Sequence, residues 1–152
     1  MSSKRQKVGK RPIIADEASA QALAQYCPDL EKWAQTWCYE QSDLVQGQRI
    51  VKFLKPFLLY LLNQRLSAKT LRKHRDHLWM LGGEVIRRRQ ENSTLRRVAV
   101  ERATFALLEE DGGPLIWPRI SESEQDAFDA TCRKLYRFFT GIKSSICKAP
   151  WR

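Results

Sequence analysis

Positively charged side chains recur at helical spacing in two separate stretches of this sequence, and phosphate groups are ligands that such side chains bind. When residues are placed at intervals of about 100°, the lysines and arginines of each stretch fall opposite its apolar residues. A cationic helix face suits DNA, because the helix fits the major groove while long basic side chains reach the flanking phosphates. The residues are Lys69, Arg72, Lys73 and Arg87, with Arg75 on the flank, in the first stretch, and Arg133, Lys134 and Arg137 in the second.

The carboxylates of the chain form no recognisable catalytic motif. The sequence has no glycine-rich phosphate loop, no Gly-x-Ser-x-Gly and no His-Glu-x-x-His. Acids gather at Asp16-Glu17, at residues 109–111 and at residues 122–124, each at a predicted helix end, where a carboxylate complements the dipole or solvates the chain. A two-metal nuclease site built from them is the disfavoured alternative. The sequence therefore predicts a protein that is not an enzyme and has no small-molecule substrate.

Metal-ligating residues are too scattered to predict a bound ion. His74 and His77 lie three residues apart, but no further ligands accompany them. No Cys-x-x-Cys pair occurs, so we expect reduced thiols, some of them buried, with no metal and no cofactor. The four cysteines are Cys27, Cys38, Cys132 and Cys147.

Charge is distributed unevenly along the 152 residues, whose formal net charge is +10. Residues 49–97 hold thirteen Lys or Arg and three acids, whereas residues 13–48 hold six acids and one Lys. An excess of cations favours polyanionic partners, because neutralised phosphates release their condensed counterions. Solubility alone also explains a basic protein, and an anionic membrane surface is the rival electrostatic partner.

The sequence contains no segment that targets or crosses a membrane. No run approaches the roughly 18 apolar residues that a membrane-spanning helix needs, and no apolar segment follows the charges at the N-terminus as in a secretory signal. We therefore expect a cytoplasmic protein with no membrane partner, associated with the nucleoid if it binds DNA.

Apolar residues at helical spacing predict an all-α fold, a compact bundle of four main helices preceded by an additional N-terminal helical segment. Residues 1–12 are expected to form a flexible basic tail, and residues 13–152 a single helical domain. The segment over 16–40 should break near Cys27-Pro28, with Asp29 as the cap of its second piece, and its stripe of Leu30, Trp33 and Trp37 should pack in the core. The expected main helices are Ser42 to about Gln64 with a kink at Pro56, Ser67 to about Arg89, Asn92 or Ser93 to about Leu108, and Ser121 to about Gly141.

Local signals place the starts and weak points of these helices. Ser67 is a good N-cap, and Ser121 with Glu124 matches a capping box. Gly82-Gly83 marks a point where the second main helix bends or allows close packing.

Two stretches resemble the core-binding domain of tyrosine recombinases, the phage integrases. Phe53–Leu61 followed by Leu66–His74 is similar to its apolar first helix and Leu-Ser-x-x-Thr cap, and Leu135–Phe139 is similar to its closing aromatic pair. The resemblance covers about residues 42–142 and implies a bundle that forms half of a clamp around duplex DNA. The contacts that it implies are Lys52 from the first helix, Lys69, Thr70, Arg72, Lys73 and Arg75 from the second, and Arg133, Lys134 and Arg137 from the fourth.

The sequence departs from the recombinases after Gly141, where only eleven residues remain for their catalytic domain. The recombination chemistry is therefore not expected. The interpretation is a non-catalytic module that binds duplex DNA in the recombination or integration of mobile elements, with a full-length recombinase or a second copy as further partners.

A protein-interaction module is the main alternative. Five tryptophans are many for a chain of this size, and Leu59 and Leu62 fall outside the main apolar stripe of their helix. The acidic stretches would then pair with a basic partner or with the chain's own cations. RNA binding shares the electrostatic argument, but no RNP-type strand or Gly-x-x-Gly loop supports it.

Overall fold

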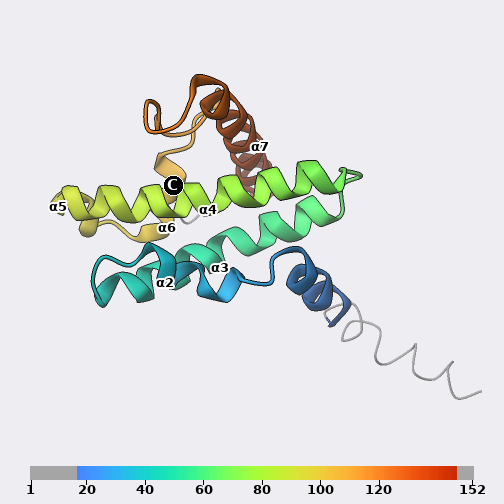
Figure 1. Ribbon diagram of the computed structural model, residues 1–152, viewed down its shortest axis with the longest axis horizontal. Coiled ribbons are helices and arrows are strands. Elements are labelled where there is room, and N and C mark those ends of the chain that lie inside the picture. The colour runs from blue at the N-terminus through green and yellow to red at the C-terminus, as the bar shows by residue number, and fades with distance from the viewer. Residues whose placement is uncertain (1–16, 147–152) are drawn as a thin grey trace, which may run out of the picture.

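Helices dominate the computed structural model, which describes residues 17–146, with side chains up to Gly141, and no β-strand occurs in that part of the chain (Figure 1). The all-α prediction is confirmed. The predicted tail, residues 1–12, lies outside the described residues, as do the side chain of Ile142 and the whole of Cys147. The helices are one over residues 17–26, the 3-10 turn η1 (Leu30–Lys32), α2 (Trp33–Trp37), α3 (Ser42–Leu62), α4 (Ala68–Glu91), α5 (Ser93–Arg96), α6 (Val100–Ala106) and α7 (Glu122–Ile146).

The two long helices α3 and α4 form an antiparallel pair around which the other helices pack. In Figure 1 they lie side by side, with α2 alongside α3 and with α7 crossing α4 at a steep angle. The apolar faces predicted from the sequence meet between them, and the most deeply buried side chains include Leu54, Phe57, Leu78, Leu81 and Phe128. Pro56 lies within α3 without ending it.

The capping signals of two long helices have the geometry that the sequence predicts. Ser67 Oγ accepts a hydrogen bond of 3.1 Å from the backbone N–H of Thr70 at the start of α4. At the start of α7, Ser121 Oγ accepts from the N–H of Glu124 at 3.1 Å, and Glu124 Oε1 accepts from the N–H of Ser121 at 2.9 Å. This is a reciprocal capping box. α7 then continues past the predicted end at Gly141, to Ile146.

The single helix predicted over residues 92–108 is wrong, because two short helices, α5 and α6, occupy that stretch. Arg89 is the physical cause. Its side chain is buried, and its Nη1 donates to the carbonyls of Leu95 and Val98, both at 3.1 Å. These bonds satisfy backbone acceptors at the end of α5, so the chain turns there before α6 begins.

Asp29 holds the cap position of η1 but makes no side-chain capping bond, so the predicted cap is wrong in its chemistry. Its Oδ1 instead lies 3.7 Å from the Sγ of Cys27, which acts as the donor. The break near Cys27-Pro28 is confirmed by the gap between the N-terminal helix and η1.

The second piece of the N-terminal helical segment, η1 and α2, belongs to the core, whereas residues 17–22, 24 and 25 of the helix before it are exposed. Trp33 and Trp37 are buried, as the stripe predicts. The ring of Trp37 lies directly on Gly82 of α4, where any side chain at position 82 would place its Cβ atom onto Cη2 and Cζ2 of the indole. Trp37 Nε1 also donates to the carbonyl of Trp79 at 3.1 Å. The glycines therefore allow the close packing that the sequence indicates.

Candidate nucleic-acid interface

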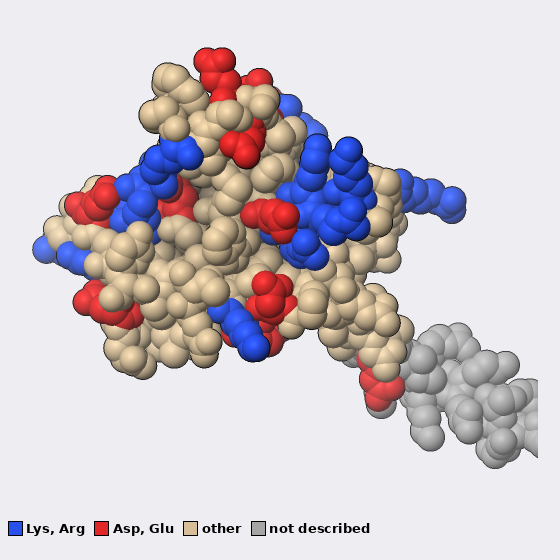
Figure 2. Space-filling view, in the orientation of Figure 1, with Lys and Arg blue, Asp and Glu red and all other residues tan. Residues whose placement is uncertain are grey.

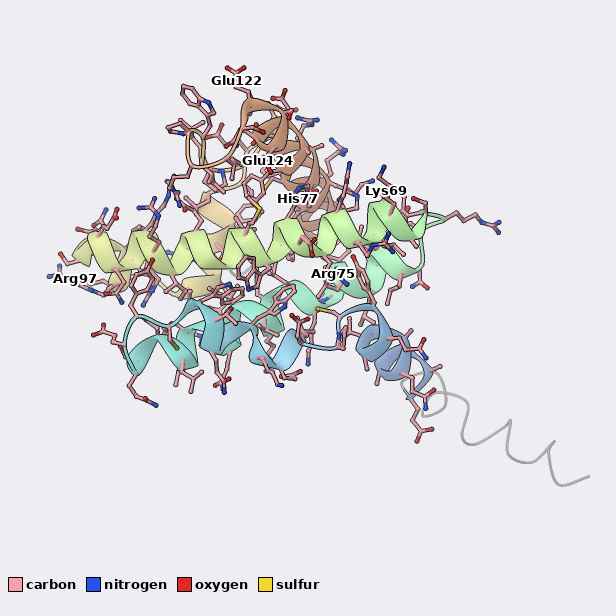
Figure 3. The ribbon with its side chains drawn as sticks, viewed as in Figure 1. Lys69, Arg75, His77, Arg97, Glu122 and Glu124 are labelled. Carbon is pink, nitrogen blue, oxygen red and sulfur yellow. The ribbon has the colours of Figure 1, made fainter. Side chains whose placement is uncertain are left out.

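Three cations stand on the first turns of α4 without a carboxylate partner. Lys69, Arg72 and Lys73 are exposed, and none of them forms an ion pair with any acid that the structure describes. Figure 2 shows blue side chains gathered over this half of α4, and Figure 3 places Lys69 at its N-terminal end. We call these three residues the α4 basic surface.

Two other predicted contacts of α4 are used within the chain. Thr70 accepts a hydrogen bond of 3.0 Å from Ser67 Oγ as part of the helix cap. Arg75 donates from Nη1 to the carbonyl of Tyr26 at 3.0 Å and pairs with Asp76 at 3.1 Å. Arg75 therefore ties α4 to the N-terminal helix, and its guanidinium is only partly free to bind a ligand.

A shared hydroxyl joins α4 to α7 beside the α4 basic surface. The Nδ1 atoms of His74 and His77 both lie 2.7 Å from Thr131 Oγ1. Because a hydroxyl carries one proton, Thr131 can donate to at most one of the two rings, so at least one imidazole donates to Thr131 from Nδ1. Burial lowers the pKa of His74 to about 4, and the nearby positive charge of Lys134 acts in the same direction. Lys134 follows Thr131 by one helical turn and therefore lies on the side of α7 that contacts α4.

The remaining cations of α7 do not form one continuous ridge. At about 100° per residue, Lys134 lies within about 60° of Thr131, whereas Arg133 lies roughly opposite Thr131. Arg133 Nη1 donates to the carbonyl of Asp111 at 3.2 Å, on the side of the connection that precedes α7. Arg137 is exposed, one turn beyond Lys134. The structure thus places Lys134 beside α4 and turns Arg133 away from it.

Lys52 is exposed on α3 but lies apart from the α4 basic surface. Its neighbours are Arg49 and Glu101, which form a two-point ion pair with N–O distances of 2.6 and 3.0 Å. The hydrogen bond from Arg49 lowers the pKa of Glu101, and the charge of Lys52 contributes in the same direction. Tyr60 lies near the C-terminal end of α3, which is joined to the start of α4. At about 1.5 Å per residue, Lys52 lies roughly 12 Å from Tyr60 along α3.

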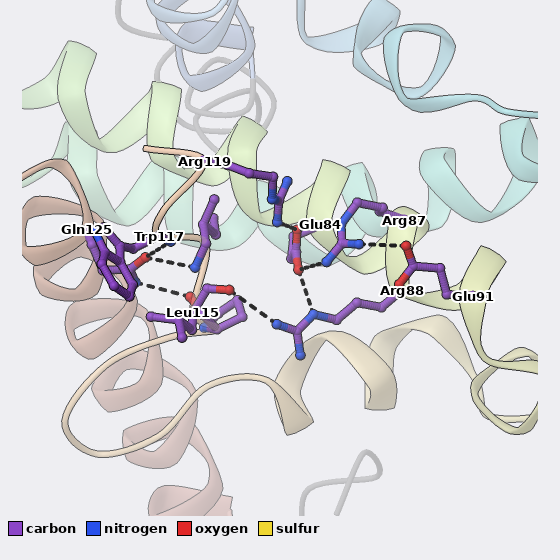
Figure 4. Close-up of polar contacts among 10 residues, drawn as sticks. Glu84, Arg87, Arg88, Glu91, Leu115, Trp117, Arg119 and Gln125 are labelled. Carbon is purple, nitrogen blue, oxygen red and sulfur yellow. Dashed lines mark hydrogen bonds and ion pairs between the residues drawn. The ribbon is translucent and has the colours of Figure 1, made fainter. Parts of the chain in front are cut away.

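Arginines in the C-terminal half of α4 bind a buried acid that the sequence analysis did not single out (Figure 4). Glu84, whose side chain is 2% exposed, binds Arg87 at 2.7 Å, Arg88 at 2.6 Å and Arg119 at 2.8 Å. Arg87 also pairs with Glu91 at 2.7 Å. Arg87, predicted on the outer cationic face, is therefore neutralised within the chain. The spacing of Glu84 to Arg87 and Arg88, i to i+3 and i+4, was the signal that could have indicated this.

Burial alone would raise the pKa of Glu84, but the hydrogen bonds from Arg87, Arg119 and Arg88 together outweigh it and lower the pKa to about 2. Side-chain hydrogen bonds also hold the connection before α7. Gln125 Oε1 accepts from the N–H groups of Ile116 and Trp117 at 2.8 and 2.9 Å. The bond from Arg119 to Glu84 and those to Gln125 therefore fix residues 114–120 between α4 and α7.

No family model, curated protein or solved structure matches the chain. The resemblance to recombinase core-binding domains thus stays a prediction.

Aromatic side chains are exposed on the same molecule. Trp79 and Trp117 are 42% and 45% exposed and Tyr39 is 63% exposed, whereas Leu59 and Leu62 are partly buried. In the part of the chain that the structure describes, no group of three or more His, Cys, Asp or Glu is placed to hold a metal ion, and no helix is long and apolar enough to cross a membrane.

Proposed function

We propose that this chain binds duplex DNA through the α4 basic surface, extended by Lys134 and Arg137 of α7. The observation that carries the proposal is the contrast between the two halves of α4. Arg87, Arg88 and Arg89 in the C-terminal half all bind acceptors of the chain itself, whereas Lys69, Arg72 and Lys73 face solvent with no carboxylate partner among the described residues. Unneutralised cations are the ones that can release counterions from a phosphate backbone.

The position of these cations suits a rod-shaped polyanion. They occupy the outer side of a long helix, and Lys134 adds a charge from the helix that crosses it. Side chains from two crossing helices can contact the backbone on both sides of a groove. The resemblance to recombinase domains supports a non-catalytic role for this binding in the recombination or integration of mobile elements.

A salt titration with matched variants tests the proposal. Binding of an end-labelled duplex is followed by fluorescence anisotropy at several salt concentrations. Five phosphate contacts predict a log–log slope of about −4 to −5, and Lys69→Ala/Arg72→Ala/Lys73→Ala should reduce it to about −2.

The control removes the same charge elsewhere. Arg96, Arg97 and Arg102 are exposed, and Figure 3 shows Arg97 at the opposite end of α4 from Lys69. Arg96→Ala/Arg97→Ala/Arg102→Ala should keep a slope near the wild-type value. A slope near zero for the wild type, or equal losses in both triple variants, would overturn the proposal.

The exposed aromatic residues favour a second candidate, a protein-interaction module. Tyr39, Trp79 and Trp117 present apolar area to solvent, and such residues are enriched at partner surfaces. Gel filtration at low and high salt without nucleic acid separates the two functions. A dimer that is insensitive to salt supports the interaction module, since the α4 basic surface by itself repels a second copy.

A further inference from the structure

Trp79 presents an aromatic ring to solvent in a fixed position on α4. Its Nε1 donates to Thr36 Oγ1 at 2.9 Å, and its carbonyl accepts from Trp37 Nε1 at 3.1 Å. The indole N–H is therefore already satisfied, and the 42% of the residue that remains exposed offers mainly ring surface. A ring held in this way loses little conformational freedom when a flat ligand stacks on it.

A groove of about 320 Å³ opens on one side of this ring. Trp79, Tyr39 and Met80 contribute its apolar walls, and Arg87 and Arg119 contribute charge. The three arginines that bind Glu84 carry three positive charges, against the two negative charges of Glu84 and Glu91. This side of Trp79 therefore has an excess of positive charge. Arg119 donates to Glu84 from Nη2, its side chain is 52% exposed, and its other N–H groups have no acceptor among the described residues.

The hollow on the other side of Trp79 has the opposite character. It is lined by Asp29 and Asp76 with Arg75, and Asp76 is paired with Arg75 at 3.1 Å. Two acids against one arginine disfavour a phosphate there. A ligand that carries both a flat ring and a phosphate therefore fits the groove on the Arg119 side.

Trp79 also shares a face of α4 with the α4 basic surface. Seven residues separate Arg72 from Trp79, which brings them within about 20° around the helix and roughly 10 Å apart along it. The face shown in Figure 2 has the cations gathered over the N-terminal half of α4 and further cations at the left of the molecule, with acidic side chains between them, and Figure 3 labels Arg75 on α4. A strand held by the α4 basic surface can extend along α4 to the groove if it passes Asp76, whose carboxylate is paired with Arg75 at 3.1 Å.

We infer that Trp79 is a stacking site for an unpaired nucleobase, with Arg119 contacting the adjoining phosphate, so that single-stranded or locally unpaired nucleic acid gains a contact that a fully paired duplex lacks. The inference rests on the proposed function, because the α4 basic surface supplies the attraction for the backbone. Bases within a duplex are already stacked on each other, whereas an unpaired base of any type offers a face to an aromatic ring. Positive charge beside an aromatic platform is the arrangement by which proteins bind single strands.

The experiment compares one labelled strand, alone and annealed to its complement, by anisotropy at fixed low salt. Trp79→Ala should weaken single-strand binding by about fivefold to 150-fold, the range expected for one lost base stack, and should leave duplex binding unchanged. Trp117→Ala is the matched control, since Trp117 is 45% exposed and lines neither groove beside Trp79. It should bind both ligands as the wild type does.

Trp79→Phe separates stacking from the structural contact to Thr36, because phenylalanine keeps a ring and lacks the indole N–H. Affinity of Trp79→Phe nearer to that of the wild type than to that of Trp79→Ala supports stacking. Quenching of a fluorescent base analogue in the bound single strand, lost in Trp79→Ala, is the second readout.

Two results overturn the inference, and they differ in what they say of the proposed function. If Trp79→Ala binds the single strand as tightly as the wild type while the α4 triple variant loses both ligands, stacking is wrong and backbone binding stands. If the wild type binds neither strand nor duplex at low salt, the proposed function fails and the inference fails with it.

Discussion

Substitution of Gly82 by alanine should destabilise the protein, although the same change in a helix ordinarily stabilises it. Alanine is favoured over glycine by about 1 kcal/mol inside a helix. At Gly82, however, the added carbon would overlap Cη2 and Cζ2 of Trp37 and lie 2.9 Å from its Cε2. Carbon atoms in contact normally lie about 3.5–4.0 Å apart, so the indole must move by about 1 Å.

The indole of Trp37 has little room to move. Trp37 is 4% exposed, and its Nε1 is bonded to the carbonyl of Trp79. Overpacking costs about 1–3 kcal/mol, and loss of the hydrogen bond costs about 1 kcal/mol more. After the gain in helix propensity, Gly82→Ala should lower the free energy of unfolding by about 1–3 kcal/mol.

Gly141→Ala is the control, because no atom of the described residues, apart from its chain neighbours and its own helix backbone, lies within 4 Å of a side-chain carbon added there. It should raise the free energy of unfolding by up to about 1 kcal/mol. Urea unfolding of both variants, followed by circular dichroism, measures the difference. A Gly82→Ala protein as stable as the wild type would show that Trp37 is not seated on α4, and the reasoning on this contact would be refuted.

Two further predictions concern buried titratable groups. Glu84→Gln should lower the free energy of unfolding by about 2–3 kcal/mol at neutral pH, because three guanidinium groups lose their anion. The folded-state pKa of Glu84, about 2, lies below the unfolded value near 4.5, so the stabilisation by its charge is present above about pH 4.5 and is lost as the pH falls toward 2. The free energies of unfolding of the wild type and Glu84→Gln, measured by urea titration, should therefore converge between neutral and acid pH. A difference that stays constant over this range would contradict the assignment. Among the described cysteines, a thiol reagent should modify exposed Cys38 first, since burial removes access to Cys27 and Cys132 and raises their thiol pKa values, that of Cys27 to about 12. Peptide mapping of the labelled protein checks the order, and early labelling of Cys132 would contradict its burial.

The parts of the fold that were predictable from the sequence depend on neighbouring residues. Ser67 caps α4 and Ser121 caps α7 because each hydroxyl reaches a backbone N–H three residues ahead. The apolar stripe Leu30, Trp33 and Trp37 required only helical spacing. Such signals are complete within about two turns of helix, so the sequence contains them in full.

The parts that escaped prediction depend on residues that meet only after folding. The turn after α5 follows from Arg89, which reaches across to the carbonyls of Leu95 and Val98. Likewise, Glu84 becomes a buried anion only because Arg119 approaches it from the connection before α7. Helical spacing describes α4 as one uniform cationic face. In the folded chain Arg87 and Arg88 bind Glu84, whereas the three residues of the α4 basic surface pair with no described carboxylate.

The same limit applies to the candidate site. Lys69, Arg72 and Lys73 were predicted on an exposed face and lie there. The crossing angle of α7 decides that Lys134 lies beside His74 while Arg133 turns to Asp111, and no spacing within α7 contains that information. Lys52 was grouped with the others through resemblance alone, and the structure places it beside Glu101.

The packing of Trp37 against Gly82 also indicates where the folded domain starts. The span that resembles a recombinase domain begins at residue 42, yet Tyr26, Leu30, Trp33 and Trp37 all lie in the interior ahead of it. A fragment that begins at Ser42 would lack these residues, and the apolar side chains on that side of the α3–α4 pair would be exposed to water. The smallest piece able to cover its own interior therefore starts no later than Tyr26, and any truncation intended to isolate the α4 basic surface must retain the chain from that residue.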